Sequence, residues 1–155
     1  MHLLFVCTGN TCRSAIAEAI ARRAVADRGL TAVVVSSAGA SAWDGSPASD
    51  GALLVGLERK LDLTNHRARQ VSRAIVEEAD LILAMGPHHV ERVAALGGAG
   101  KAWLLTDYAQ RTDAGRAIVD PFGGGLEVYR ATSDELERQV ASALDRLAEG
   151  LTGAP

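Results

Sequence analysis

The fold of this chain is decided by residues 3–14, which read LLFVCTGNTCRS. The apolar residues before Cys7 have the character of a buried strand, and an alanine-rich pattern with helical spacing follows Ser14. The small and polar residues between them are typical of a tight loop that opens onto the N-terminus of a helix. Such a loop directs backbone N–H groups and the helix dipole toward one point, which predicts an anion site there.

Cys7 is the candidate nucleophile of this loop. A thiol at an anion site is favoured in its thiolate form, and Arg13 supplies a second group that binds phosphate oxygens. The bare spacing Cys-x5-Arg is weak evidence, and the alternative interpretation is a free buried cysteine at a strand end. The strand before the loop and the helix after it favour a cysteine that attacks phosphate.

The composition indicates one soluble globular domain over residues 1–155, with 48% hydrophobic and 23% charged residues. A net charge of −3 predicts no basic face for nucleic acid or an anionic membrane. The sequence shows neither a signal peptide nor a spanning segment, so we expect a cytoplasmic protein, and we expect it to be a monomer. Cys7 and Cys12 lie too close together to link distant parts of the fold, and they make a poor zinc site, so no metal is expected.

Strands and helices alternate along the chain. Apolar and β-branched runs predict strands over four ranges: 3–6, 31–36, 80–85 and 101–105. Helical spacing predicts helices over 14–28 and 72–78, and from Gly86-Pro87. This alternation predicts an α/β domain with a four-stranded parallel sheet and helices on both faces, whose ligands bind beyond the carboxyl ends of the strands.

Two further helices and one long loop complete the predicted order. Ser46-Pro47 is expected to open a helix whose core-facing side carries Leu53, Leu54, Leu57 and Leu61. Thr132 and Glu135 have capping-box spacing and predict the start of a C-terminal helix. Residues 106–125 show no periodicity, and loops of this length are usually functional or mobile.

Asp120 is the candidate proton donor that a phosphocysteine mechanism requires. It lies between an apolar pair and Pro121 near the end of the long loop, although an Asp-Pro pair also starts ordinary turns. His66 alone reads as a structural histidine, and His88 and His89 read as solvated. Trp43 fits a pocket wall or a loop anchor equally well.

Taken together, the motifs resemble the low-molecular-weight protein tyrosine phosphatases along nearly the whole chain. The matching segments are CTGNTCRS at 7–14, SAG at 37–39, HRARQ at 66–70, AD at 79–80 and DPF at 120–122. The resemblance implies a flavodoxin-like, Rossmann-like phosphatase fold that needs no cofactor. It also implies phosphorylated proteins as substrates and inorganic phosphate as product.

The resemblance assigns roles to individual residues. It implies Cys7 as nucleophile, Arg13 as phosphate clamp, and Asp120 as general acid and then base. The phosphate-binding loop would comprise Thr8, Gly9, Asn10, Thr11, Cys12 and Ser14. Ser14 would donate a hydrogen bond to the Cys7 sulfur, while Asn10, Ser14, Ser37 and His66 would form the polar network that supports the loop. Cys12 would form a reversible disulfide with Cys7 under oxidation.

Two departures from the tyrosine-specific pattern concern substrate choice. Thr11 stands where those enzymes carry a bulky aliphatic residue, and Phe122, the expected pocket wall beside Trp43, is followed by Gly123 instead of a second aromatic residue. Both features resemble the bacterial protein arginine phosphatase branch and favour phosphoarginine over phosphotyrosine. The alternatives are a plain tyrosine phosphatase, an arsenate reductase, whose disulfide relay needs further cysteines that this chain lacks, and a non-catalytic phosphate-binding module.

Overall fold

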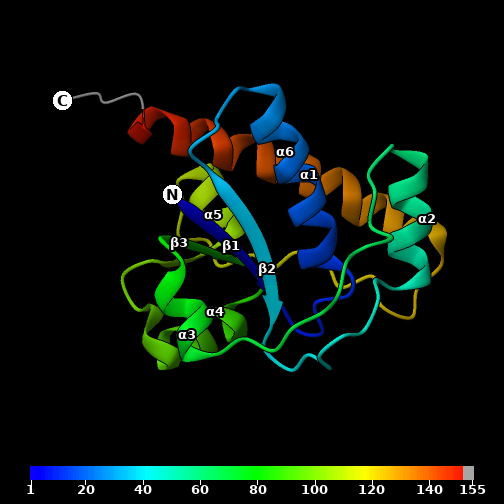
Figure 1. Cartoon of the computed structure of the whole chain (residues 1–155), viewed down its shortest axis with the longest axis horizontal. Coiled ribbons are helices and arrows are strands. Elements are labelled where there is room, and N and C mark those ends of the chain that lie inside the picture. Colours follow the sequence, from blue (N-terminus) through cyan, green and yellow to red (C-terminus); the bar gives the residue numbers. More distant parts are fainter. Residues whose placement is uncertain (152–155) are drawn as a thin grey trace.

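A four-stranded parallel sheet lies at the centre of the computed structural model, which describes residues 1–151 (Figure 1). Its strands are β1 (His2–Cys7), β2 (Val34–Gly39), β3 (Leu81–Ala84) and β4 (Ala102–Leu104). They are ordered β2-β1-β3-β4, and every adjacent pair is parallel. The prediction of a single α/β domain with a four-stranded parallel sheet is confirmed.

Alternate side chains of β1 enter two separate cores. Leu3 and Phe5 pack into the larger core and Leu4 and Val6 into the smaller one, because successive residues of a strand point to opposite faces. The larger core lies under α1 (Arg13–Asp27), α2 (Asp50–Glu58), α5 (Leu105–Gln110) and α6 (Leu126–Leu151). The smaller core lies under α3 (Arg73–Glu78), α4 (Pro87–Val93) and a π-helical turn, Ala94–Gly98.

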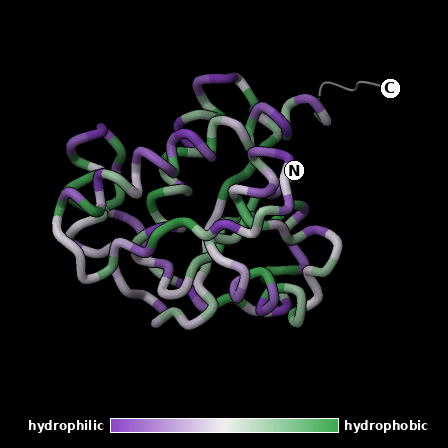
Figure 2. Tube along the Cα trace, turned by 180° about the vertical axis from the view of Figure 1, so that it is seen from behind, coloured by the Kyte–Doolittle hydropathy of each residue, from purple (hydrophilic) through white to green (hydrophobic). Residues whose placement is uncertain are grey.

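The two helical layers are visible on opposite sides of the sheet in Figure 1, with α1 and α6 on one side and α3 and α4 on the other. The trace in Figure 2 is mostly hydrophobic near its centre and hydrophilic at its outer turns. No helix within residues 1–151 is long and apolar enough to span a membrane. The two layers of helices bury the two faces of the sheet.

The strand order places the end of β1 at a topological switch point. The chain leaves β1 toward β2 on one side and later returns to β3 on the other side of β1. Ligands of open parallel sheets bind where the order reverses, outside the carboxyl ends of the strands. Cys7 is the last residue of β1 and stands at this position.

The second strand lies three residues later than the predicted range 31–36. Val34 begins the strand and is 61% exposed, because β2 is the edge of the sheet. The strand ends in small residues, and a Cβ at Gly39 would collide with the carbonyl oxygen of Thr8. The small residues at the strand end are therefore needed for close approach to the loop after β1.

The second helix begins at Asp50, and the prediction of a start at Ser46-Pro47 was wrong. Ser49 is the N-cap, and its Oγ accepts a hydrogen bond from the N–H of Ala52. Ser46 lies outside the helix, where its carbonyl oxygen accepts the N–H of Ala68.

The predicted core-facing leucines of this helix were only partly correct. Leu53 packs against the core and Leu61 is buried beyond the helix, whereas Leu54 and Leu57 are 50% and 78% exposed. The buried side of α2 carries small residues, Ala52, Val55 and Gly56, which allow close packing.

Two predicted boundaries in the C-terminal third were also wrong. Part of the range predicted as a loop, 106–125, is taken by α5, where Leu105, Tyr108 and Ala109 are buried at helical spacing. The last helix begins at Leu126, so Thr132 is an interior residue and not a cap. Its hydroxyl donates to the carbonyl oxygen of Val119, which ties the preceding loop to α6.

Candidate active site

A pocket of about 190 Å³ lies at the carboxyl end of β1. It is lined by Cys7, Thr8, Gly9, Thr11, Cys12, Arg13, Asp120 and Phe122. The first turn of α1 also meets this point, because Cys12 is the N-cap and Arg13 the first helical residue. The Cys12 side chain makes no capping hydrogen bond, so the helix N-terminus is available to a bound anion.

The loop between β1 and α1 is held by hydrogen bonds to four of its carbonyl oxygens. They join Cys7 O to Ala40 N (2.8 Å), Thr8 O to Ser41 N (2.9 Å), Asn10 O to His66 Nε2 (2.6 Å), and Thr11 O to Ser49 N (3.0 Å). The partners come from two segments distant in sequence, 40–49 and the residues around His66. The carbonyl oxygens are therefore fixed toward the surrounding protein.

The backbone N–H groups of Thr8 to Cys12 have no hydrogen-bond acceptor within residues 1–151. The missing partners are unusual at Asn10 and Cys12, which are buried, because buried backbone donors are nearly always paired. The carbonyl oxygens of this loop point away from the pocket, toward residues 40–49 and His66. The N–H groups are therefore available to the pocket that contains Cys7. This arrangement can bind the oxygens of a phosphoryl group.

Asn10 is the centre of the polar network that supports the loop. It is fully buried with φ at 57°, a left-handed conformation that asparagine tolerates better than most residues. Its Nδ2 donates to the hydroxyls of Ser14 and Ser37, each at 2.8 Å, and its Oδ1 accepts the N–H of Arg69 at 3.0 Å. These three bonds engage both polar atoms of the side chain, and the backbone carbonyl oxygen of Asn10 is bound separately to His66.

Ser14 lies 2.9 Å from the Cys7 sulfur and is fully buried. Because its Oγ accepts a hydrogen bond from Asn10, its own proton is free to point at Sγ of Cys7. Ser37 is used in the same way: it accepts from Asn10 and donates to Glu18 Oε1 at 2.7 Å. The network therefore orients the hydroxyl of Ser14 so that it donates a hydrogen bond to the sulfur of Cys7.

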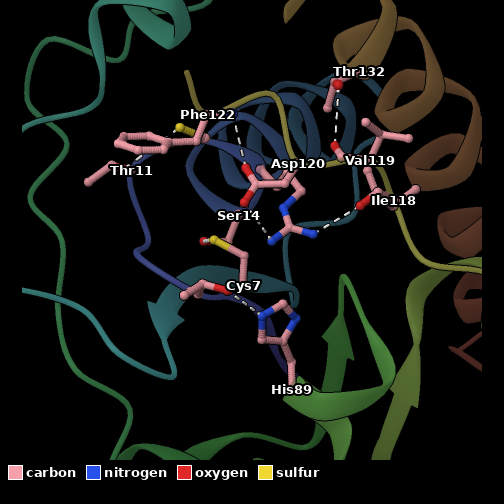
Figure 3. A network of polar contacts seen from close by, with 12 residues as sticks. Cys7, Thr11, Ser14, His89, Ile118, Val119, Asp120, Phe122 and Thr132 are labelled. Carbon is pink, nitrogen blue, oxygen red and sulfur yellow. Dashed lines mark hydrogen bonds and ion pairs between the residues drawn. The ribbon is translucent and has the colours of Figure 1, made fainter. Parts of the chain in front are cut away.

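Arg13 and Asp120 meet at the rim of the pocket. Nη1 of the buried Arg13 donates to Ile118 O at 2.9 Å, and Nη2 lies 3.6 Å from Asp120 Oδ2. The Asp120 side chain is 52% exposed, and its Oδ1 accepts the N–H of Phe122 at 3.1 Å. In Figure 3, Asp120 and His89 lie on opposite sides of Cys7.

The prediction that His88 and His89 are both solvated was wrong for His89, whereas His88 is exposed as predicted. His89 is fully buried, and its Nε2 lies 2.8 Å from Oγ1 of Thr8 in the phosphate-binding loop (Figure 3). Its Nδ1 has no partner within residues 1–151. Burial, with the nearby charges of His88 and Arg13, lowers the pKa of His89 to about 4. Its position one turn before the buried Val93 was the available signal.

The side chain of Cys12 contacts the hydroxyl groups of Ser49 and Tyr129. Its Sγ lies 3.2 Å from Oγ of Ser49 and 3.3 Å from the hydroxyl of Tyr129. Burial and the Cys12 contact raise the pKa of Tyr129 to about 12, so its hydroxyl stays protonated. Tyr129 lies on α6, more than a hundred residues away, and no sequence motif marked it. Both cysteines are free thiols.

The two predicted pocket-wall aromatics lie in different surroundings. Phe122 is 75% exposed and lines the pocket, while Trp43 is 84% exposed and is absent from the pocket lining. Thr11 lines the pocket directly. Of the three side chains, Thr11 and Phe122 therefore lie at the pocket, and Trp43 does not.

The chain was compared with known proteins. The family model described as low molecular weight phosphotyrosine protein phosphatase matches residues 2–152. A protein-arginine-phosphatase from Bacillus subtilis (strain 168) is 38% identical over 151 residues, covering 94% of this chain and 98% of the relative. A protein-arginine-phosphatase from Geobacillus stearothermophilus is 40% identical over 152 residues, covering 97% and 95%.

Among solved structures, a mutant of YwlE arginine phosphatase with a phosphorylated active site serine has a TM-score of 0.87 and 35% identity. The match covers 99% of this chain and 97% of that one. The likeness thus extends over the whole fold and includes the loop after β1. The chain belongs to the low molecular weight phosphotyrosine protein phosphatase family and is a phosphatase.

Proposed function

We propose that this phosphatase removes phosphoryl groups from arginine side chains of proteins through a phosphocysteine intermediate at Cys7. The observation that carries the proposal is the ring of five uncommitted N–H groups, Thr8 to Cys12, around a pocket that also contains Arg13. A trigonal arrangement of phosphoryl oxygens in the transition state needs many donors around one point, and this loop supplies them.

In the first step, the thiolate of Cys7 attacks phosphorus in line with the leaving group. The sulfur–phosphorus bond forms while the bond to the guanidinium nitrogen breaks, and Asp120 donates a proton to that nitrogen. The hydroxyl of Ser14, 2.9 Å from the sulfur, stabilises the thiolate before attack. Arg13 binds the non-bridging oxygens, which its position in the pocket lining supports.

In the second step, water hydrolyses the phosphocysteine. Asp120, now ionised, takes a proton from the water as its oxygen bonds to phosphorus, and the sulfur leaves as thiolate. Inorganic phosphate departs and the enzyme regains its starting state. No cofactor enters either step. The 52% exposure of the Asp120 side chain supports both roles, because the carboxyl must reach the leaving group and then water.

Thr11 supports the preference for phosphoarginine. It lines the pocket with a small polar side chain, which leaves room for a planar guanidinium and offers it a hydroxyl. Phe122 is exposed at the rim and is followed by Gly123, so one aromatic ring is present to contact a substrate side chain. The two arginine-phosphatase relatives, at 38% and 40% identity, support the same choice.

The first test separates nucleophile from acid. Cys7→Ser should abolish turnover of an aryl phosphate, while Asp120→Asn should lower kcat by about 10² to 10⁴ and change the affinity for inorganic phosphate little. Turnover and phosphate binding are measured on the same preparations, with circular dichroism to confirm folding. Equal losses of kcat and phosphate affinity in Asp120→Asn would remove Asp120 from the acid role.

The second test concerns the substrate. We expect wild type to have a higher kcat/KM for a phosphoarginine peptide than for the matched phosphotyrosine peptide, and Thr11→Ile to shift this ratio toward phosphotyrosine. Thr11→Ser, which keeps the hydroxyl, is the matched control and should keep the preference. A ratio unchanged in Thr11→Ile contradicts the role of Thr11, and a wild-type preference for phosphotyrosine makes the protein a plain tyrosine phosphatase.

We further infer three properties that accompany this activity: a reversible Cys7–Cys12 disulfide that protects the nucleophile from over-oxidation, a monomeric state, and action in the cytoplasm. Both cysteines are free and belong to the same short loop, which supports the first. A net charge of −3, which makes copies of the chain repel one another, is compatible with a monomer.

A further inference from the structure

A second and larger cavity, of about 500 Å³, lies behind the phosphate-binding loop. Its walls come from α1, from the end of β2 and from the segment 60–69, which runs alongside α1 in Figure 1. Five cationic side chains line this cleft: Arg22, Arg23, Lys60, Arg67 and Arg69. Two carboxylates, Glu18 and Asp62, also line it, which leaves the cleft with three more positive than negative charges.

Most of this positive charge is not neutralised by the protein. Within residues 1–151, the five cations of the cleft make one ion pair, which joins Arg22 Nη1 to Glu18 Oε2 at 3.0 Å. The side chains of Arg23, Arg67 and Arg69 donate only to backbone carbonyl oxygens, which carry no net charge. The side-chain ammonium group of Lys60 makes no polar contact in the described part of the chain, although its carbonyl oxygen accepts from Arg23. Asp62 is engaged by the N–H and hydroxyl of Thr64.

This charge pattern differs from most of the surface. The protein has a net charge of −3, and outside the cleft most arginines pair with carboxylates, as in Arg28–Asp145, Arg59–Glu137 and Arg130–Glu58. A concave site that gathers uncompensated cations focuses the field and raises the local concentration of anions. The cleft therefore has the electrostatics of an anion site, on a protein that is acidic overall.

We propose that this cleft binds a small anion with a chain of phosphate groups. A phosphate chain presents several charged oxygens over a short length, which matches cations distributed around a cavity, and guanidinium groups bind phosphate in a bidentate manner. The volume lies within the range of small-molecule sites. Ala15, Leu61 and Leu63 form an apolar part of the wall, which a nucleobase could contact.

The cleft shares part of its wall with the network that holds Asn10. Ser37, His66 and Arg69 line the cleft, and each makes a hydrogen bond to Asn10. A ligand in the cleft therefore contacts residues that fix the left-handed conformation of the phosphate-binding loop. The binding site is nevertheless separate from the pocket of Cys7, since the two linings share no residue.

The experiment is isothermal titration with inorganic tripolyphosphate, using Arg13→Ala to disable the catalytic pocket. Wild type saturated with orthovanadate serves in its place if Arg13→Ala does not fold. We expect one molecule bound per chain. Lys60→Gln/Arg67→Gln should weaken binding by about ten-fold or more, because two charged contacts are lost. Arg92→Gln/Arg138→Gln, which removes the same charge from exposed sites elsewhere, should change it less than two-fold.

Parallel titrations with a nucleoside triphosphate distinguish the sources of the phosphate chain: tighter binding than tripolyphosphate indicates a nucleotide, and equal binding indicates the chain alone. The inference is overturned if tripolyphosphate does not bind, if both double variants lose affinity equally, or if an acidic peptide binds and tripolyphosphate does not. The proposed function is independent of these outcomes, since the titrated proteins have no working catalytic pocket.

Discussion

His89 joins α4 to the phosphate-binding loop through a single side-chain contact. Its Nε2 reaches Oγ1 of Thr8, and its environment is closed to solvent. Protonation of both nitrogens would bury a cation close to Arg13, which is why its pKa falls to about 4. His89 therefore remains neutral near pH 7, and supports the loop without contributing charge.

The lowered pKa of His89 predicts a pH-dependent contribution to stability. The unfolded chain binds a proton at His89 below about pH 6.5, whereas the folded protein binds it only near pH 4. The free energy of unfolding should therefore fall as the pH decreases from 6.5 to 4, by up to about 3 kcal/mol from this residue.

The measurement is urea unfolding at several pH values in wild type, His89→Gln and His88→Gln. His89→Gln keeps a polar contact to Thr8 and should lose less stability on acidification than wild type. His88→Gln, at the exposed neighbour, should follow wild type. A constant difference between wild type and His89→Gln across this range contradicts a buried neutral histidine.

At the residue scale, the sequence identified the groups that are contiguous in it. Cys7, Arg13 and Ser14 could be predicted to lie together, because Cys7 ends the strand and the other two residues begin the helix after one short loop. Asn10 was assigned to the network through resemblance alone, since its partners Ser37 and His66 are distant in sequence. Tyr129 and His89 were missed because each reaches the loop from a helix distant in sequence, α6 and α4 respectively.

At the element scale, α2 and α6 pack so closely that one position between them admits only glycine. A Cβ at Gly51 would overlap the ring of Tyr129, which also contacts Ser49 and Cys12 through its hydroxyl. The position of α2 thus decides where Tyr129 lies and, through it, the surroundings of Cys12. The same close packing explains why small residues fill the buried side of α2 and leave Leu57 exposed.

Two glycine-to-alanine substitutions in helices should have opposite effects. Gly51→Ala should destabilise the protein by about 1–3 kcal/mol, because the added methyl group displaces the ring of Tyr129. Gly150→Ala, in α6 with open space around it, should stabilise by a few tenths to about 1 kcal/mol through helix propensity. Thermal or urea unfolding measures both. Stabilisation by Gly51→Ala would contradict the close contact between α2 and Tyr129.

The elements that the sequence predicted well are those whose pattern is set by the sheet. β1, β3 and β4 agree with their predicted ranges to within a residue or two, because buried parallel strands are nearly continuous apolar runs. The errors fall where tertiary contacts decide a boundary. Ser46 is held by Ala68 outside α2, and Thr132 is bonded to the loop before α6, so neither serves as the cap that its local sequence suggests.

At the scale of the whole molecule, the fold brings four separate segments to one end of the sheet. The loop after β1 provides donors, segments 40–49 and 60–69 fix its carbonyl oxygens, and residues 118–122 bring Asp120 to the rim. The parallel sheet and its switch point were predictable from strand–helix alternation, and with them the location of the site. The cleft behind the loop was not, because its cations come from α1 and the segment 60–69.

The central claim is that Cys7 becomes phosphorylated during turnover. When the substrate is an aryl phosphate of an acidic phenol, the phenolate can leave without a proton donor. Hydrolysis of the phosphocysteine, in contrast, needs Asp120 as the base. Asp120→Asn should therefore accumulate the intermediate. Rapid quenching followed by peptide mass spectrometry should show one phosphoryl group per chain, on Cys7, in Asp120→Asn and in Asp120→Asn/Cys12→Ser. A burst of phenol without a phosphoryl group on Cys7, or a phosphoryl group found on another residue, would contradict the mechanism.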